Sequence, residues 1–422
     1  MNTENGNDID GLLAEDVGDI DAQMARAGVD EHDSEPESPP AIDFTDEQRN
    51  AMVAVEGWFF NESKHRQVFR LFGYAGAGKT SMAREMAEAI RTATGKAVVF
   101  GAYTGKAASV LRSKGCPANT IHGLIYKPSE EAKLDKDGKV EKDESGKVIK
   151  ELNFHLRPGS VRPDTTALIV IDECSMVGEK LGADLLSFGV PVLVLGDPAQ
   201  LPPVGDGGYF TNHEPDVLLT EVHRQADGCG VLDIATKVRT DGARSVPFGD
   251  YGDSQVLPIS RLFHLPLLEY DQVLVGKNAT RKSYNRKMRM MQGRHGPLPQ
   301  TGDRLICLRN SHAIGLMNGE QVHVIESKEL DGDRLQIVFD WNGKPYEYAV
   351  SKHAFEDRPG QPEWGDGLLH FDFGHAITTH KAQGSEWGNV LVIDESRVFR
   401  ADADKWLYTA VTRASDRVTV VR

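Results

Sequence analysis

The chain has 422 residues and a formal net charge of −15, and its 40% hydrophobic and 26% charged residues suit a soluble globular protein of two or three domains. No apolar run of about 18 residues predicts a membrane span, and the N-terminal stretch MNTENGNDIDGLL has neither the basic nor the apolar region of a secretory signal. The four cysteines lie far apart without a CxxC pair, which argues against a disulfide framework or a zinc site and favours reduced thiols in a cytoplasm.

The first 42 residues differ in composition from the rest of the chain. Residues 1–40 hold twelve acidic residues and one arginine, a local charge of −11, which leaves only about −4 on the remaining residues. This composition, with few aromatic residues and the ending SEPESPP, is typical of a disordered acidic tail. Such a tail can serve solubility alone, recruit a partner such as a replication or recombination protein, or mimic nucleic acid.

Regular elements are expected from Phe44 onward. The segment TDEQRNAMVAVEGWFF predicts a helix that begins with Thr45 as a cap and Gln48 three residues later. Four further segments each join an apolar strand to a polar loop: QVFRLFGYAGAGKT, KAVVFGAYTGK, ALIVIDECSMV and PVLVLGDPAQ. Strands that alternate with helices predict an α/β fold with a parallel sheet, and chemistry is expected where the carboxyl ends of these strands meet.

Two segments interrupt this alternation. Residues 127–150 hold seven lysines and seven acidic residues with DG and SG turn signals, which predicts a solvated β-hairpin insert. Residues from about 299 to 370 contain short strands separated by turns, which is the pattern of a small β-barrel. Between the two inserts, DQVLVGKNATRKSYNRKMR predicts a strand and a basic helix that is either a positive surface or a solvated helix face. A second α/β domain, split by the barrel, resumes after residue 370.

The stretch GYAGAGKT at residues 73–80 matches the full pattern of a phosphate-binding loop between a strand and a helix. Its glycines let backbone N–H groups approach phosphate oxygens, and the helix N-terminus adds a positive field. Lys79 is expected to reach the β- and γ-phosphates of ATP and Thr80 to hold Mg²⁺. The loop alone leaves open a kinase, a switch GTPase, a transporter motor or a helicase.

An acidic pair narrows this choice. Asp172 and Glu173 follow an apolar strand, where burial of charge is costly without a metal ion or a partner. We expect Asp172 to hold Mg²⁺ through water and Glu173 to deprotonate an attacking water. Adjacent Asp and Glu residues favour hydrolysis and argue against a small-molecule kinase.

Three further polar residues complete the expected ATP site. Gln200 follows the next strand and is placed to sense the γ-phosphate. Arg224, in LTEVHRQ, and Arg413, in LYTAVTRAS, are candidates to stabilise charge on the γ-phosphate during hydrolysis. Each arginine taken alone is more often part of a surface ion pair, but together with the loops they favour the catalytic role.

The ordered series TDEQ, GYAGAGKT, YTGKAA, TIHGLIY, IDECSMV, GDPAQLPPV, EVHRQ, ITTHKAQGSEW and YTAVTRA resembles the motif set of superfamily-one DNA helicases, most closely the RecD-like branch that includes the bacteriophage Dda-type helicases. The resemblance spans roughly residues 44–422. It implies two RecA-like domains with ATP between them, a pin-like insert in the first domain and an SH3-like barrel in the second. It also implies 5′ to 3′ movement on single-stranded DNA and unwinding of the duplex at a fork.

The resemblance also implies roles for individual residues. Gln48 would read adenine, and Gly384 and Glu386 would line the ATP cleft from the second domain. The phosphate loop would contribute Gly73, Ala75, Gly76, Ala77, Gly78, Lys79, Thr80 and Ser81. The DNA track would include Thr104, Lys106, Thr120, His122, Thr379 and His380. Family members often carry an aromatic residue in the pin, whereas the sequence KLDKDGKVEKDESGKVIK has none and Phe154 lies just after it.

We therefore expect a monomeric ATP-dependent DNA helicase or translocase with four parts. They are a tail at 1–42, a first RecA-like domain at 43–219 with a pin-like insert at about 127–157, a second at 220–298 and 371–422, and the barrel at 299–370. Two alternatives stay open at this stage. One is a nucleotide-controlled protein that binds single-stranded DNA without moving, and the other is the motor subunit of a helicase–nuclease complex.

Overall fold

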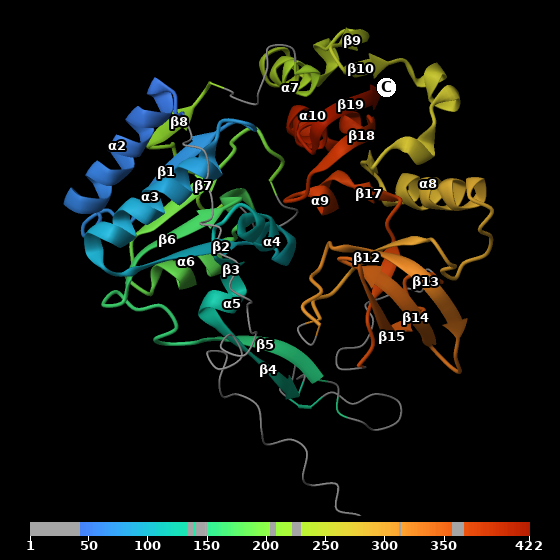
Figure 1. Cartoon of the computed structure of the whole chain (residues 1–422), viewed down its shortest axis with the longest axis horizontal. Coiled ribbons are helices and arrows are strands. Elements are labelled where there is room, and N and C mark those ends of the chain that lie inside the picture. The colour runs from blue at the N-terminus through green and yellow to red at the C-terminus, as the bar shows by residue number, and fades with distance from the viewer. Residues whose placement is uncertain are drawn as a thin grey trace, which may run out of the picture. The chain divides into compact units, whose positions relative to one another are not determined.

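The first α/β region is built on a six-stranded sheet (Figure 1). In the computed structural model the strand order is β3-β2-β6-β7-β1-β8, and all neighbouring strands run parallel. Every residue of β7 and all but the last of β6 are buried, as the predicted coverage of both faces requires. The strands are β1 (Val68–Gly73), β2 (Ala97–Ala102), β3 (Ala118–Thr120), β6 (Thr166–Asp172), β7 (Val192–Gly196) and β8 (Val217–Leu219).

The first helix of this region begins and ends close to its predicted positions. The capping box at the start of the first helix is confirmed, because Thr45 Oγ1 accepts from Gln48 N at 3.3 Å and Gln48 Oε1 accepts from Thr45 N at 3.0 Å. Two helices, α5 and α6, were not anticipated. The helices are α2 (Asp46–Asn61), α3 (Lys79–Thr94), α4 (Gly105–Ser113), α5 (Ile121–Ile125) and α6 (Glu179–Leu186).

The structure describes residues 43–132, 139–140, 148, 150–202, 208–221, 229–311, 314–356 and 367–422. The predicted tail at 1–42 and Arg224 therefore lie outside the described residues. Contacts divide the chain into Met1–Phe44 and Thr45–Arg422, and the second unit holds every element named here. Among the described residues, no helix combines the length and the apolar character that a membrane crossing needs.

A two-stranded antiparallel sheet lies where the hairpin insert was expected. Strand β4 (Tyr126–Ala132) pairs with β5 (Lys150–Leu156), with Tyr126 opposite Leu156. Phe154, which follows the charged stretch in the sequence, lies inside β5 and within the insert expected at about 127–157. Its side chain is 45% exposed. The hairpin thus carries an accessible aromatic ring that the charged residues between its strands did not indicate.

The second α/β region has its own six-stranded sheet, of order β17-β11-β18-β19-β10-β9, in which only the edge strand β9 runs antiparallel. Its strands are β9 (Gly249–Tyr251), β10 (Ser254–Leu257), β11 (Gln272–Val275), β17 (Ala376–Thr378), β18 (Trp387–Ile393) and β19 (Ala414–Val421). Its helices are α7 (Gly230–Asp241), α8 (Asn278–Met291), α9 (Thr379–Ala382) and α10 (Ala403–Val411).

A third, antiparallel sheet is inserted between β11 and β17, with the order β15-β14-β13-β12-β16. It encloses a separate apolar core that includes Leu305, Phe339 and Phe371. The sheet runs past the predicted boundary at residue 370, because β16 pairs with β12. Its strands are β12 (Arg304–Cys307), β13 (Gln321–Glu329), β14 (Arg334–Trp341), β15 (Lys344–Ser351) and β16 (Phe371–Phe373). The likeness to an SH3 barrel stays a prediction.

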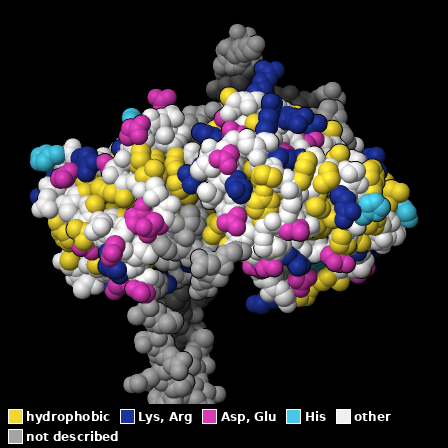
Figure 2. Space-filling view, turned by 90° about the horizontal axis from the view of Figure 1, so that it is seen from above, with side chains coloured by type: hydrophobic (Ala, Val, Ile, Leu, Met, Phe, Trp, Pro, Cys, Tyr) yellow, Lys and Arg dark blue, Asp and Glu magenta, His cyan; other side chains and the backbone are white. Residues whose placement is uncertain are grey.

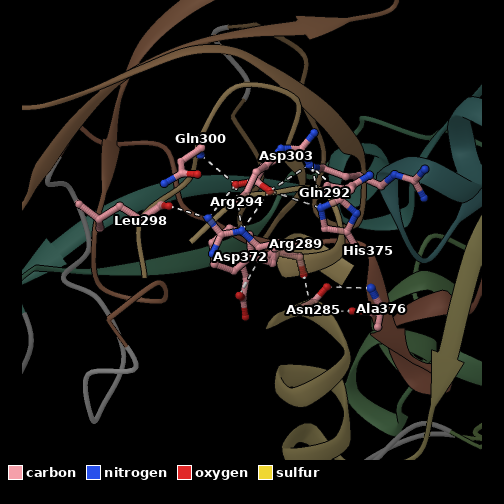
Figure 3. A network of polar contacts seen from close by, with 12 residues as sticks. Asn285, Arg289, Gln292, Arg294, Leu298, Gln300, Asp303, Asp372, His375 and Ala376 are labelled. Carbon is pink, nitrogen blue, oxygen red and sulfur yellow. Dashed lines mark hydrogen bonds and ion pairs between the residues drawn. The ribbon is translucent and has the colours of Figure 1, made fainter. Parts of the chain in front are cut away.

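Helix α8 joins this sheet to the second α/β region through buried polar contacts (Figure 3). Arg289 lies 3.0 Å from the fully buried carboxylate of Asp303, and Arg294 lies 3.4 Å from it. Arg281 pairs with Asp372 at 2.5 Å. Three cations of the predicted basic helix region are therefore engaged inside the protein, which leaves fewer of them for a positive surface.

Candidate active site

The phosphate-binding loop joins β1 to α3 and depends on two glycines. Gly76 and Gly78 have φ values of +84° and +78°, which other L-residues adopt only with strain. A Cβ atom on Gly78 would also lie 2.6 Å from Gln48 Nε2. That amide donates to the carbonyl of Ala77 at 3.0 Å, so Gln48 supports the loop from α2. Its predicted contact with adenine stays a proposal.

The side chains of the loop are held by neighbouring oxygen atoms. Lys79 Nζ donates to the carbonyl oxygens of Gly73 at 2.6 Å and Tyr74 at 3.1 Å. Thr80 Oγ1 donates to Asp172 Oδ2 at 3.2 Å, which brings together the two residues predicted to serve Mg²⁺. Because β1 and β6 belong to the same parallel sheet, their carboxyl ends place these groups at one edge, as predicted.

Glu173 lies in an environment that differs from that of a surface carboxylate. Its φ of +52° is rare for a residue other than glycine, and such strain is concentrated at functional sites. Burial raises the pKa of Glu173, while the positive charges of Arg413 and Lys79 oppose that rise. A carboxylate with a raised pKa is a stronger base, provided that nearby cations keep it ionised.

One cavity of about 140 Å³ collects most of the predicted ATP-site residues from both α/β regions. The predicted residues that line it are Ala75, Gly76, Lys79, Thr80, Asp172, Glu173, Gln200, Gly384, Glu386 and Arg413. Its volume is below the roughly 300–1,000 Å³ of typical small-molecule pockets. Of the remaining loop residues, Ala77 is buried and Ser81 is exposed.

Arg413 forms the second-domain wall together with the turn before β18. The guanidinium is buried and donates to the carbonyl oxygens of Thr409 at 3.1 Å and Ser385 at 3.3 Å. Gly384, with a φ of +72°, approaches the first domain so closely that a Cβ atom there would lie 3.2 Å from Ala107 Cβ. The cavity thus has walls from two sheets, as the arginine positions suggested.

Two residues that contribute to the contact between the two α/β regions, Asp197 and Tyr408, were not predicted from the sequence. Asp197 follows β7 and is 3% exposed, and burial raises its pKa. The Tyr408 hydroxyl of α10 donates to Asp197 Oδ2 at 2.8 Å and accepts from Ala75 N at 3.0 Å. An acid that directly follows an apolar run was the signal for Asp172, and the same signal marks Asp197. Tyr408 had no signal beyond its place in the segment that contains Arg413.

Gln200 also faces this cavity. Its side chain is 7% exposed, and its Oε1 atom makes no hydrogen bond within the part of the chain that the structure describes. The next residue, Leu201, is fixed from the second domain by Thr409 Oγ1 at 2.7 Å and Gln383 Nε2 at 2.7 Å. The loop after β7 is therefore held by hydrogen bonds from the second domain at Leu201, while Gln200 Oε1 stays available as an acceptor for a bound water.

The residues predicted to contact DNA occupy different environments. Thr104 and Thr120 cap α4 and α5, accepting from Ala107 N at 3.1 Å and Gly123 N at 3.0 Å. Lys106 is half-buried with its ammonium 4.7 Å from the ring centroid of Trp387, and burial lowers its pKa to about 8. Thr379 is fully buried, so its predicted contact with DNA requires a rearrangement.

The two predicted histidines are half-buried, and burial lowers the pKa of both. His122 packs among aromatic rings near the hairpin, and His380 lies 5.5 Å from the ring centroid of Phe399. Figure 2 shows basic, acidic and apolar side chains interspersed on the face that it presents.

Two family models match the chain. An AAA domain matches residues 44–253, and a UvrD-like helicase C-terminal domain matches residues 373–421, so that together they cover more than half of the chain. The two matches fall on the two α/β regions whose residues meet at the cavity. By sequence, the chain is similar to the RecD/Dda-like helicases of superfamily one.

Individual relatives of this helicase family agree with the assignment. The ATP-dependent RecD2 DNA helicase of Deinococcus radiodurans is 28% identical and aligns with 84% of this chain and 46% of its own length. The ATP-dependent DNA helicase dda of Enterobacteria phage T4 is 29% identical over 47% of this chain and 43% of its own length. The chain therefore spans less than half of each of these two curated relatives.

A solved structure supports the same helicase fold. It is described as showing DNA unwinding at forked double-stranded DNA by two coordinating Pif1 helicases. This chain superposes on it with a TM-score of 0.52 at 18% identity, over 90% of this chain and 92% of the other. At this identity the likeness concerns the fold, which in both chains extends well beyond the phosphate-binding loop.

Proposed function

We propose that this chain is an ATP-dependent DNA helicase or translocase that moves on single-stranded DNA and unwinds duplex DNA at forks. The observation that carries the proposal is the two-walled cavity, in which the phosphate loop of one α/β region faces Arg413 of the other. A nucleotide bound there contacts both regions at once, so binding and release of its γ-phosphate would change the contact between them. Relatives named as ATP-dependent DNA helicases support the same reading.

Hydrolysis is assigned to residues that already lie around this cavity. Lys79 would leave its two carbonyl acceptors to contact the β- and γ-phosphates. Glu173 would accept a proton from the attacking water, which Gln200 would hold through its available Oε1 atom. Arg413, and Arg224 by the resemblance, would balance the charge that develops on the γ-phosphate.

Mg²⁺ fits the residues that adjoin the loop. Thr80 Oγ1 and Asp172 Oδ2 are oxygen atoms 3.2 Å apart, and Mg²⁺ in such sites binds a few protein oxygens and completes its shell with phosphates and water. The ion would neutralise phosphate charge when it is bound. No cluster of three or more His, Cys, Asp or Glu side chains suited to a metal occurs in the described ranges, so we propose no all-protein metal cage.

The DNA path is proposed to follow Thr104, Lys106, Thr120 and His122 on the first region and Thr379 and His380 on the second. The 5′ to 3′ direction rests on the resemblance and on no single residue. Proteins that track single strands combine cations with stacking groups and avoid reading base edges. The hairpin, with the accessible ring of Phe154, is proposed as the pin that separates the two strands.

Strand displacement on duplexes with a 5′ or a 3′ single-stranded overhang tests activity and direction together. We expect ATP-dependent displacement from the 5′ overhang only, and ATP hydrolysis that rises sharply when single-stranded DNA is added. Hydrolysis that no nucleic acid stimulates would overturn the motor proposal. DNA binding that responds to ATP without strand displacement would favour a nucleotide-controlled DNA-binding protein. Strand displacement only after addition of a partner protein would favour a subunit of a larger complex.

A further inference from the structure

The second residue of the phosphate-binding loop, Tyr74, contacts the second α/β region. The guanidinium carbon of Arg239, in the last turn of α7, lies 3.8 Å from the centroid of the Tyr74 ring. Both residues are half-buried. The phosphate-loop pattern leaves position 74 open to any residue, so the motif gave neither Tyr74 nor Arg239 a role.

The contact between these two side chains is a stack of a cation on a ring. Within the part of the chain that the structure describes, the Arg239 side chain makes no hydrogen bond or ion pair, and the Tyr74 hydroxyl makes no hydrogen bond. A guanidinium stacks on an aromatic face better than an ammonium does, because it is planar and more weakly hydrated. The ring face of Tyr74 is therefore the group that Arg239 recognises.

The backbone of Tyr74 organises the rest of the loop. Its carbonyl oxygen accepts from Ala77 N at 3.1 Å and from Lys79 Nζ at 3.1 Å. Its own N–H group donates to the carbonyl of Leu219 across 3.4 Å, which is longer than the usual 2.7–3.2 Å or so of such bonds. The first region therefore holds this N–H group weakly, and the stack on Arg239 adds a restraint at the residue on which the turn and Lys79 depend.

The next residue of the loop is also held from the second region. Ala75 N donates to the Tyr408 hydroxyl at 3.0 Å, and Ala75 packs against an apolar cluster that includes Val238 and Trp406. Val238 of α7 directly precedes Arg239, so α7 and α10 share this one core. Two consecutive loop residues are thus contacted by two helices that pack together.

We propose that Arg239 is a positioning residue for the nucleotide. By stacking on Tyr74 it holds the phosphate loop in the shape that receives the phosphates, although it does not itself line the cavity there. The inference rests on the proposed function, because it assigns a residue of the second region to the same ATP site. A loop that is held before binding loses less conformational freedom when the nucleotide arrives, so the stack strengthens binding.

Equilibrium binding to the full chain tests this inference. A fluorescent, non-hydrolysable ATP analogue is titrated in the presence of Mg²⁺, and inorganic tripolyphosphate is measured by competition against it. We expect Arg239→Ala to weaken the binding of both ligands by the same factor, about 2- to 30-fold, which corresponds to the ~0.5–2 kcal/mol of a cation–π contact. The factor is the same because Arg239 acts through the loop and not on the base.

A double-mutant cycle and matched variants separate the stack from a general effect on folding. Tyr74→Ala should weaken binding as Arg239→Ala does, and the double variant should lose little more, because all three remove one contact. Tyr74→Phe keeps the ring and should bind like wild type, whereas Arg239→Lys keeps the charge without the planar group and should bind more weakly. Lys237→Ala removes a half-buried cation on another face of α7 and should leave both affinities unchanged.

Three results would overturn the inference while the wild type still binds nucleotide. They are unchanged or tighter binding by Arg239→Ala, additive losses in the double variant, and a loss for the ATP analogue without a loss for tripolyphosphate, which would mean that Arg239 contacts the base or ribose. If Arg239→Ala does not fold, Tyr74→Ala and Tyr74→Phe make the same comparison from the loop. If the wild type binds no nucleotide, the proposed function fails as well.

Discussion

Lys79 is held by carbonyl oxygens of its own loop, so its role in phosphate binding requires it to change partners. We expect Lys79→Ala to reduce ATP turnover by at least about 100-fold, because a positive charge at the developing phosphate charge is lost. Single-stranded DNA binding should be retained, since the loop lies apart from the residues proposed for DNA. Turnover and DNA affinity of the purified variant measure the two effects.

Lys64→Ala, at an exposed position just before β1, is the matched control and should change neither quantity. A Lys79→Ala variant that unwinds DNA at the normal rate would show that the phosphate loop is misassigned.

Burial of Lys106 predicts that the affinity for single-stranded DNA depends on pH. Burial lowers its pKa to about 8, so the free protein loses this charge as the pH rises through 8. DNA phosphates prefer the protonated form, so the affinity for single-stranded DNA should fall several-fold between pH 7 and pH 9. Kd values measured across this range at constant ionic strength show the slope.

Lys106→Arg supplies the comparison, because arginine does not deprotonate in this range. Its affinity should stay nearly constant from pH 7 to pH 9. An equally steep pH dependence in this variant would assign the effect to another group and would remove Lys106 from the DNA path.

At the scale of elements, α10 connects the two α/β regions through Tyr408. The pKa of this hydroxyl is raised by burial, so it stays protonated and serves as the donor to Asp197. Tyr408→Phe would leave a buried carboxylate without one donor and Ala75 N without an acceptor. We expect unfolding to become easier by about 1–3 kcal/mol, measured by denaturant titration.

Tyr346→Phe in β15 is the matched control. Its hydroxyl makes no hydrogen bond among the described residues, so its removal should change the free energy of unfolding little. Combining Tyr408→Phe with Asp197→Asn should cost less than the sum of the two single changes, because the two side chains share one interaction. Strict additivity in this cycle would contradict the proposed link between α10 and the loop after β7.

Several elements could be predicted because their local signals agree with the fold. The strand before DECSMV is a continuous apolar run, and the strand before GYAGAGKT is apolar except for Arg70. The loops after both strands carry residues with specific chemistry, so strand and site position could both be predicted. The segment at 249–270 lacked such agreement: β9 and β10 are only three and four residues long, and their order in the sheet is set by pairing with β19. Pairing between distant segments leaves no local pattern in the sequence.

The site shows the same division. Lys79 and Thr80 were predictable from the phosphate-loop motif and Asp172 from the acidic pair after a separate strand, and the structure brings the three together. Phe154 was expected inside the insert at about 127–157 but after its charged stretch, and the structure places it in β5, which continues to Leu156. Tyr408 was missed because a tyrosine in an apolar helix predicts core packing, and its polar partner lies 211 residues away in the chain.

At the scale of the whole molecule, the inserted antiparallel sheet is coupled to the second α/β region by Asp303 and its neighbours (Figure 3). Asp303 has no exposed surface, and its carboxylate accepts from Arg289 Nε at 3.0 Å and from Gln300 N at 2.8 Å. His375 Nε2, just before β17, lies 3.5 Å from the same carboxylate. This contact links the segment before β17 to Asp303, the residue just before β12.

This network makes the stability of the protein depend on pH. Burial alone would raise the pKa of Asp303, but hydrogen bonds from His375 and Arg289 outweigh it and lower this pKa. The contribution of Asp303 to the free energy of unfolding is therefore complete above about pH 4, and it is lost as the pH falls through the pKa of the folded state. Burial lowers the pKa of His375 in the folded protein. On acidification the unfolded chain therefore protonates this histidine at a higher pH than the folded protein does, and stability begins to decline below about pH 6.5. Both groups therefore predict a loss of stability on acidification.

Arg289→Ala should be the most damaging change at this junction. It leaves the Asp303 carboxylate buried with one fewer cation, and removing one partner of a buried ion pair costs about 3–5 kcal/mol. Denaturant unfolding at pH 7.5 measures the loss, and Arg91→Ala, which breaks an exposed pair with Glu88 in α3, should cause no measurable change. Because Asp303 connects the inserted sheet to the second α/β region, the proposed helicase function predicts that Arg289→Ala lowers strand displacement more than DNA-stimulated ATP turnover. Equal loss of both activities would instead indicate that the network acts only through the stability of the fold.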